Sequence, residues 1–125
     1  MVFSFKDRLK SFPYAFSGLR VLIRSQHNAW IHALATVAVV AFGLWIGLAA
    51  WEWCALVLAI GLVWMAESLN TALEFLADEV SQEKRELIGK AKDVGAAGVL
   101  IAAVTSVVIG LLVFVPHLMT WIFAH

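Results

Sequence analysis

The chain has 125 residues, of which 62% are hydrophobic and 14% are charged, and its nine basic side chains balance its nine acidic ones. This composition is too apolar for an ordinary soluble domain, and it excludes intrinsic disorder, collagen and a disulfide scaffold. The zero net charge excludes a basic nucleic-acid binder, which needs excess positive charge to attract phosphates. A mean hydropathy of +0.89 therefore indicates an integral membrane protein.

Residues 1–28 are expected to form an amphipathic surface helix. Apolar residues recur at alternating intervals of four and three from Phe5 to Ile23, while basic residues occupy other positions. A helix of this kind lies in the membrane interface. Ser11 followed by Pro13 predicts a break, with Ser11 capping a second helix. The segment is either a plain surface anchor or part of the substrate site, and both interpretations stay open.

Three transmembrane helices are predicted, at 29–50, 53–78 and 94–115, because about 20 predominantly apolar residues cross a bilayer. Pro116 is expected to end or kink the third helix. The predicted fold is thus an all-α membrane protein, with one domain over residues 1–125 and three transmembrane helices after the surface helix.

The basic residues predict the orientation of these spans. All nine either precede the first span or lie in the 79–93 loop. By the positive-inside rule, the N-terminus and that loop are cytoplasmic in a multi-pass protein of the bacterial inner membrane. The turn at 51–53 and the C-terminus then lie on the outer side, where Trp45, Trp51, Trp53 and Trp121 form an aromatic belt.

Five polar residues interrupt the second span at helical spacing. Their offsets of 0, 3, 4, 7 and 11 place them on one helix face: Glu67, Asn70, Thr71, Glu74 and Asp78. Counted from Trp53, Glu67 lies about 21 Å down the helix and Glu74 about 31 Å. Because ionisable residues are costly inside a membrane, this polar stripe indicates a functional site near the cytoplasmic boundary.

The residue types of the stripe suggest its chemistry. Two carboxylates a heptad apart, with the Asn70 amide between them, offer oxygen ligands for Mg²⁺ and a partly desolvated general base. Such a site suits a reaction between a water-soluble reagent and a lipid headgroup. Alternatively, the stripe hydrogen-bonds to other helices or begins a cytoplasmic cap, which accounts for Asp78 better than for Glu67.

Lys92 and Asp93 mark the start of the third span. The lysine can neutralise phosphate charge and the aspartate can bind a second metal or a ribose, although a simple helix-capping pair is the alternative. Neither of the two common glycine-rich phosphate loops occurs, so any nucleotide would be held by metal-bridged carboxylates and basic side chains. The four histidines are scattered, which argues against a zinc site. A stripe of small residues every fourth position predicts close helix packing: Gly98, Ala102, Ser106 and Gly110.

The run from Glu67 to Glu74, Glu-Ser-Leu-Asn-Thr-Ala-Leu-Glu, is followed by Asp78 and by the Lys92–Asp93 pair. This pattern resembles the prokaryotic diacylglycerol kinase family, which includes undecaprenol kinases, and the resemblance covers nearly the whole chain. It implies a homotrimer of three-span subunits whose active sites form between protomers at the cytoplasmic interface. MgATP would phosphorylate the hydroxyl of a membrane lipid there.

The resemblance also implies roles for individual residues. Glu67 matches the general base, Asn70 lies beside it, and Glu74 matches a metal-binding carboxylate. Further positions match nucleotide contacts: Tyr14, Glu83, Arg85, Lys92 and Asp93. One position departs from the family, because Gln26 stands where many members have a metal-binding glutamate. Its amide oxygen can bind Mg²⁺ but carries no charge, so weaker metal binding is expected.

The acceptor lipid and two other functional classes stay open at this point. The segment from Gln26 to His32 resembles the Glu-x-Asn-x-x-Ile-His run of the undecaprenol kinase branch, which favours a polyprenol over diacylglycerol. The first rival is a small ion- or proton-coupled transporter subunit that uses Glu67 and Glu74 as a relay. Residues 53–66 supply almost no polar group for such a relay. The second rival is a non-catalytic assembly protein with the same fold.

Overall fold

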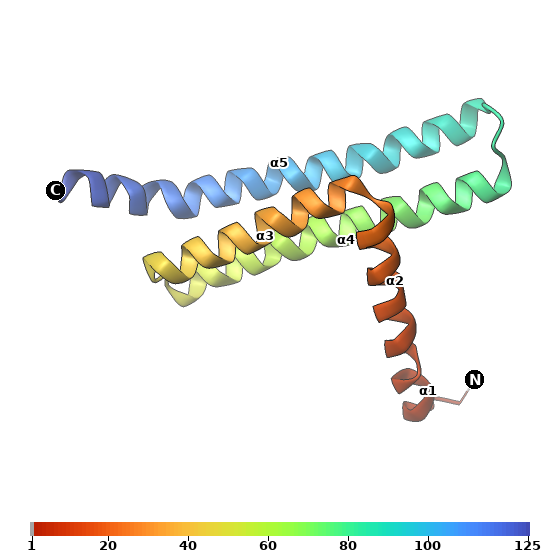
Figure 1. The fold of residues 1–125 in the computed structure, drawn as a ribbon, viewed down its shortest axis with the longest axis horizontal. Coiled ribbons are helices and arrows are strands. Elements are labelled where there is room, and N and C mark those ends of the chain that lie inside the picture. The colour runs from red at the N-terminus through yellow and green to blue at the C-terminus, as the bar shows by residue number, and fades with distance from the viewer. Residues whose placement is uncertain (1) are drawn as a thin grey trace.

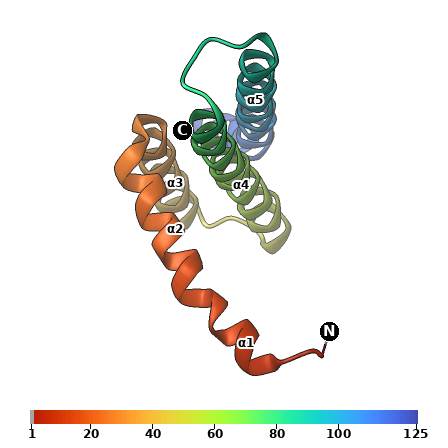
Figure 2. The same ribbon diagram turned by 90° about the vertical axis from the view of Figure 1, so that its right-hand side faces the viewer.

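The structure is a computed structural model that describes residues 2–125. It contains the helices α1 (Phe5–Leu9), α2 (Ser11–Ser25), α3 (His27–Ile46), α4 (Ala50–Val80) and α5 (Glu86–Phe123). Helices α3, α4 and α5 run along the long axis, and α2 and α1 lead away from them (Figures 1 and 2). The predicted all-helical fold, with an N-terminal helical segment and three long apolar spans, is confirmed.

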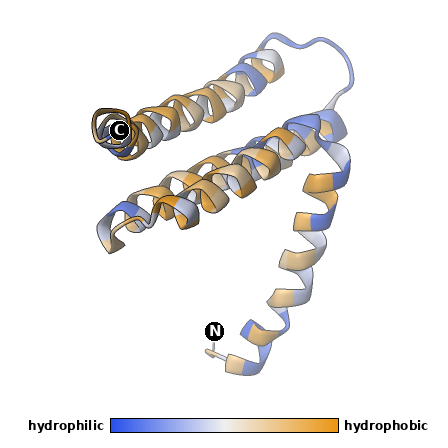
Figure 3. Ribbon diagram, turned by 60° about the vertical axis from the view of Figure 1, so that its left-hand side comes forward, coloured by the Kyte–Doolittle hydropathy of each residue, from blue (hydrophilic) through white to orange (hydrophobic). Residues whose placement is uncertain are grey.

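The three long helices expose most of their apolar side chains in the single chain. Leu58 and Leu112, for example, are both largely exposed. Figure 3 shows hydrophobic residues over the length of these helices and more hydrophilic ones toward the connection between α4 and α5. Large apolar side chains on an outer surface suit hydrocarbon surroundings, so the surface agrees with three membrane-spanning helices.

The N-terminal segment is broken at Lys10, as the Ser11–Pro13 pattern predicts, but the cap differs from the expectation. Lys10 is the N-cap of α2, and no side chain caps the helix there. The Ser11 hydroxyl instead donates to the Asp7 carbonyl at 3.4 Å. Ser11 therefore does not cap α2, because its side chain bonds back to α1. Pro13 fits because its missing N–H lies in the first turn, where backbone donors have no partner within the helix.

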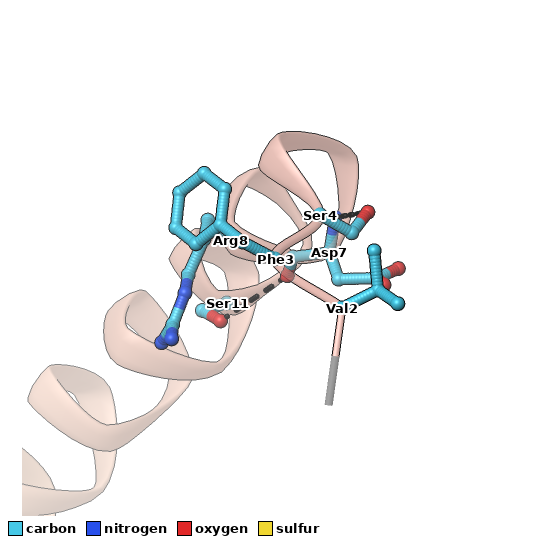
Figure 4. Close-up of a pocket in the computed structure, with 6 residues that line it drawn as sticks. All are labelled: Val2, Phe3, Ser4, Asp7, Arg8 and Ser11. Atoms are coloured by element: carbon cyan, nitrogen blue, oxygen red, sulfur yellow. Dashed lines mark hydrogen bonds between the residues drawn. The ribbon is translucent and has the colours of Figure 1, made fainter.

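The far end of α1 folds around an open hollow of about 270 Å³ (Figure 4). The Ser4 hydroxyl oxygen accepts a hydrogen bond from the Asp7 N–H at 3.3 Å, and the Arg8 guanidinium lies 5.8 Å from the centre of the Phe3 ring. These side chains are exposed, apart from the half-buried Ser4. The hollow reflects the local capping of α1, far along the N-terminal segment from the three-helix bundle.

The turn between α3 and α4 comes earlier than the expected 51–53. Gly47 ends α3 in the left-handed conformation, with φ of 79°, which a glycine adopts without steric strain. The Glu52 carboxylate then accepts from the Ala49 N–H at 2.8 Å, so α4 begins at Ala50. Near this turn the Trp53 ring packs on Gly43, where an added Cβ would lie 2.8 Å from the ring.

Helices α4 and α5 form the most extensive helix pair of the fold. Only residues 81–85 separate them, so the predicted 79–93 loop is mostly helical. Pro116 does not end α5, which continues to Phe123. A break at this position would release backbone groups that a hydrocarbon environment cannot satisfy. The observed helices therefore run beyond the predicted limits of 53–78 and 94–115.

The packing between α4 and α5 uses part of the predicted small-residue stripe. Ala102 is buried, and the Ser106 hydroxyl donates to the Ala59 carbonyl at 3.0 Å. Gly98 instead faces open space. Helices α5 and α4 approach each other most closely at Gly95 of α5, where an added Cβ would collide with the Asn70 side chain of α4. This glycine lies outside the stripe and brings the α5 backbone against the polar face of α4.

Candidate functional site

The polar stripe of α4 faces the interior of the fold at one end of the bundle. Glu67 is only 2% exposed and Thr71 is also buried, while Asn70 and Glu74 are half-buried and Asp78 is exposed. The helical spacing that places these side chains on one face thus directs the first four toward neighbouring helices. We call Glu67, Asn70, Thr71 and Glu74 the inner cluster.

Glu67 meets a histidine from the neighbouring helix. His32 of α3 places its Nε2 atom 3.4 Å from the Glu67 Oε2 atom. This separation lies within ion-pair range, yet within residues 2–125 neither atom has a hydrogen-bond partner of good geometry. Buried polar atoms are normally hydrogen-bonded, because leaving them unpaired costs free energy. The Glu67 Oε2 atom is therefore left to be satisfied either by the facing His32 Nε2 atom after a small side-chain rotation or by a group that a bound molecule brings.

The His32 ring is held in place by its surroundings. The Trp64 ring meets it edge to face, with 6.3 Å between ring centroids. The Trp64 indole N–H donates to the Thr36 hydroxyl at 3.0 Å, and that hydroxyl donates to the His32 carbonyl at 2.7 Å. Sequence reasoning gave His32 no role at the site. Its only local signal was the Ile-His ending of the Gln26–His32 segment, since contact with Glu67 depends on how α3 and α4 are aligned.

Asn70 and Glu74 contribute further oxygen atoms. The Asn70 Nδ2 atom donates to the Glu74 Oε1 atom at 3.3 Å, which turns the Asn70 Oδ1 atom toward α5 beside Gly95. In the described part of the chain, this buried Oδ1 and the Thr71 hydroxyl oxygen have no hydrogen-bond partner. Sequence reasoning did not single out Gly95, because its importance comes from a contact between helices.

The oxygen donors of the inner cluster fit an incomplete Mg²⁺ site. Mg²⁺ is usually held by one or two carboxylates together with substrate phosphates and water. The Glu74 carboxylate and the unpaired Asn70 Oδ1 supply donors of this kind. Residues 2–125 contain no group of three or more His, Cys, Asp or Glu side chains that could hold a metal ion. Gln26 lies at the junction of α2 and α3, where it occupies the N-cap position of α3 without a side-chain hydrogen bond to that helix.

The other predicted site residues lie outside the inner cluster. Lys92 forms an ion pair with Asp78, with 2.5 Å between Nζ and Oδ1, which joins the start of α5 to the end of α4. Tyr14 is 79% exposed in the first turn of α2. Glu83 and Arg85 lie in the exposed connection before α5, and Asp93 is exposed on α5. A single chain therefore brings together Glu67, Asn70 and Glu74 and leaves four predicted nucleotide contacts open to other molecules.

A mostly apolar groove of about 300 Å³ lies between α3, α4 and α5. Along α3 its wall extends from Ile31 to Val39, and His32, Thr36 and Ser106 are its polar side chains. His32 thus touches two features at once, because its ring lines the groove and its Nε2 atom faces Glu67. The groove connects the polar end of the site with the apolar interior of the bundle.

Comparisons with known proteins identify relatives of this chain. Residues 13–114 match the family model of prokaryotic diacylglycerol kinase. The chain is 38% identical over 109 residues to the undecaprenol kinase of Bacillus subtilis, covering 87% of this chain and 89% of that protein. It is also 38% identical over 113 residues to a diacylglycerol kinase of Synechocystis sp., covering 90% of this chain and 65% of that protein.

A third relative, the diacylglycerol kinase of Escherichia coli strain K12, is 32% identical over 100 residues, covering 80% of this chain and 82% of that protein. The family match spans most of the chain and includes the whole inner cluster. The chain therefore belongs to the prokaryotic diacylglycerol kinase family, and it is a lipid kinase of the diacylglycerol/undecaprenol kinase type.

Proposed function

We propose that this lipid kinase transfers the γ-phosphoryl group of ATP to a membrane lipid alcohol at the cytoplasmic interface, with undecaprenol preferred over diacylglycerol. One observation carries the proposal, namely the buried Glu67 carboxylate whose Oε2 has no hydrogen-bond partner in the described chain. Sequence identity does not favour either acceptor, because an undecaprenol kinase and a diacylglycerol kinase are each 38% identical to this chain. The preference for undecaprenol rests on the Gln26–His32 segment.

Glu67 is proposed as the general base. Its carboxylate takes the proton from the lipid hydroxyl as the hydroxyl oxygen attacks the γ-phosphorus. The O–H bond breaks, a new O–P bond forms, the bond from the γ-phosphorus to the bridging oxygen breaks, and ADP leaves. Burial supports this role, because a site closed around the carboxylate keeps water away from the reacting groups. Asn70, one turn away, helps to order the site.

Glu74 and Asn70 Oδ1 are proposed to hold Mg²⁺, with Gln26 as a further neutral oxygen donor. When bound, this ion neutralises charge on the phosphates and aligns them. Lys92 adds positive charge at the same end of the bundle, where Asp78 fixes its position. Phosphoryl transfer mainly needs positioning and charge neutralisation, so these few groups suffice without a separate nucleotide domain.

The active site is proposed to be completed between the protomers of a homotrimer. Tyr14, Glu83, Arg85 and Asp93 support this proposal, because each is exposed and outside the inner cluster in one chain. A neighbouring copy can supply the missing nucleotide contacts. The distribution of basic residues supports an inner-membrane protein with its N-terminus and the α4–α5 connection in the cytoplasm. The transporter alternative lacks support, since α4 has no charged residue between Glu52 and Glu67.

The direct test is transfer of radiolabel from [γ-³²P]ATP in mixed micelles, with undecaprenol and diacylglycerol assayed side by side at equal mole fraction. We expect label in both lipids, with a higher kcat/KM for undecaprenol. A higher kcat/KM for diacylglycerol would overturn the acceptor preference and leave the kinase activity intact. Label in neither lipid would contradict the proposed reaction.

A further inference from the structure

We infer that His32 is a positioning residue of the phosphoryl-transfer reaction, which holds the Glu67 carboxylate in the orientation that accepts the lipid hydroxyl proton. The inference rests on the proposed role of Glu67 as general base. It adds a residue of α3, a helix that supplied none of the site residues expected from the sequence. It also explains why two buried polar atoms face each other without a completed hydrogen bond.

The distance between the two side chains supports this role. His32 Nε2 and Glu67 Oε2 are 3.4 Å apart, and an N–H···O bond forms at about 2.9 Å. A small rotation of either side chain therefore completes the bond. An imidazole that carries hydrogen on Nε2 donates to the carboxylate, which leaves the other carboxylate oxygen for the lipid hydroxyl. Catalytic bases are commonly oriented by a third group in this way.

The surroundings of His32 make it suitable as a fixed donor. Its ring lies edge-on to Trp64, and Thr36 links the Trp64 indole to the His32 backbone carbonyl. The two hydrogen bonds hold the Trp64 indole in place, and the imidazole packs against the edge of that indole. A donor that is already ordered loses little conformational entropy when it binds the carboxylate, so it can hold Glu67 at low cost.

The groove provides independent support, because it places His32 next to the expected path of the acceptor. His32 is one of its few polar wall residues, and Glu67 is not among the described residues that line it. A hydrocarbon chain in the groove would bring its hydroxyl group to the end marked by Ile31 and His32. The lipid hydroxyl then lies next to the Glu67 carboxylate, which the His32 imidazole holds in position.

The experiment compares three substitutions at His32 with a matched control. His32→Gln keeps an N–H donor, His32→Leu fills the space without one, and His32→Ala removes both. His27→Gln is the control, because His27 is an exposed histidine at the start of the same helix. Each full-length protein is purified in detergent and checked for assembly by size-exclusion chromatography, and kcat and the KM for MgATP are measured with undecaprenol.

We expect His32→Ala and His32→Leu to lower kcat about 10- to 100-fold with the KM for MgATP within twofold, as misplacement of a catalytic group does. His32→Gln should retain most of the kcat, and His27→Gln should match the wild type. Equal loss in Gln and Leu, or a kcat within twofold of wild type in Leu, would overturn the inference. If His32→Ala fails to assemble, the comparison of kcat between His32→Gln and His32→Leu still tests the role of His32.

Glu67→Gln is measured in the same series, so that the two proposals can fail separately. If Glu67→Gln abolishes turnover and His32→Leu is fully active, Glu67 remains the base and the role of His32 is wrong. If Glu67→Gln remains active, Glu67 is not the general base, and the role of His32 that rests on it is wrong as well. An inactive wild-type protein would instead contradict the proposed reaction itself.

Discussion

Two buried glutamates of α4 each lie next to a histidine, Glu52 in the first turn of the helix and Glu67 near its middle, and the two pairs differ in their hydrogen bonding. We call the end of the bundle near the α3–α4 turn the outer end and the opposite end the inner end, after the proposed orientation. At the outer end, Glu52 Oε1 lies 2.7 Å from His117 Nε2, and Glu52 Oε2 accepts from the Ala49 N–H. Toward the inner end, Glu67 Oε2 lies 3.4 Å from His32 Nε2 and completes no hydrogen bond in residues 2–125. The glutamates are similarly buried, at 6% and 2% exposed.

This difference separates a structural pair from one that we propose takes part in the reaction. The outer pair satisfies both oxygens of Glu52, joins α4 to α5 and helps to form the turn after α3, so it stabilises the fold. The inner pair leaves polar atoms unsatisfied about 22 Å away along the same helix, which lowers stability unless a ligand completes it. An unsatisfied buried group in a folded protein calls for an explanation, and the proposed role of Glu67 as general base supplies one here.

The first prediction, which has the largest expected effect, concerns the same substitution at Glu67 and at Glu52. Glu67→Gln should lower kcat by about 1,000-fold or more, because it removes a general base, while assembly stays unchanged. Glu52→Gln should keep activity within about threefold of wild type, since the outer pair takes no part in the reaction. Initial rates of lipid phosphorylation measure both effects. Similar losses in the two variants would show that the two ends do not differ in function.

The second prediction concerns the contact that shapes the inner end. Gly95→Ala should lower kcat about 10- to 100-fold, because the new Cβ collides with the Asn70 side chain and displaces it from Glu74. Gly98→Ala is the matched control, since a Cβ at Gly98 meets nothing within 4 Å. Rates and size-exclusion profiles are measured for both. Wild-type activity in Gly95→Ala would mean that the position of Asn70 does not matter for turnover.

The residues of the inner end show what could and could not be predicted from the sequence. Glu67, Asn70 and Glu74 lie on one helix, so the helical period alone placed them on one face. His32 and Gly95 contribute through the alignment of α4 with α3 and α5, which no local pattern encodes. The ends of the helices differ from the limits expected for the spans for a similar reason. Gly47 terminates α3 early, and membrane surroundings favour a helix that continues through Pro116.

The third prediction tests the structural role of the outer pair. His117→Ala removes the partner of a buried carboxylate and should lower the midpoint of thermal unfolding by about 5 °C, with kcat nearly unchanged. His125→Ala serves as the control, because His125 is an exposed C-terminal histidine. Thermal unfolding in detergent is followed by loss of soluble protein. An unchanged midpoint together with reduced kcat would reverse the roles assigned to the two ends.

The smallest expected effect concerns charge at the inner end. Gln26→Glu should lower the Mg²⁺ concentration at half-maximal activity by about threefold, because a carboxylate binds this ion more strongly than an amide. The measurement is a Mg²⁺ titration at fixed ATP, with Gln82→Glu as a control in the exposed connection before α5. An unchanged titration would remove Gln26 from the proposed metal site.

The unequal lengths of α3 and α4 have a consequence for how so small a protein can act on a water-soluble molecule. A three-residue turn joins the two helices, so the difference between the 31 residues of α4 and the 20 of α3 falls almost entirely at the inner end. The excess is about 16 Å of helix, and α5 runs back alongside it (Figure 1). Two spans thus extend past the third as a helical hairpin that carries Asp78 and Lys92. In the orientation proposed above, this hairpin lies on the cytoplasmic side and takes the place of an appended soluble domain.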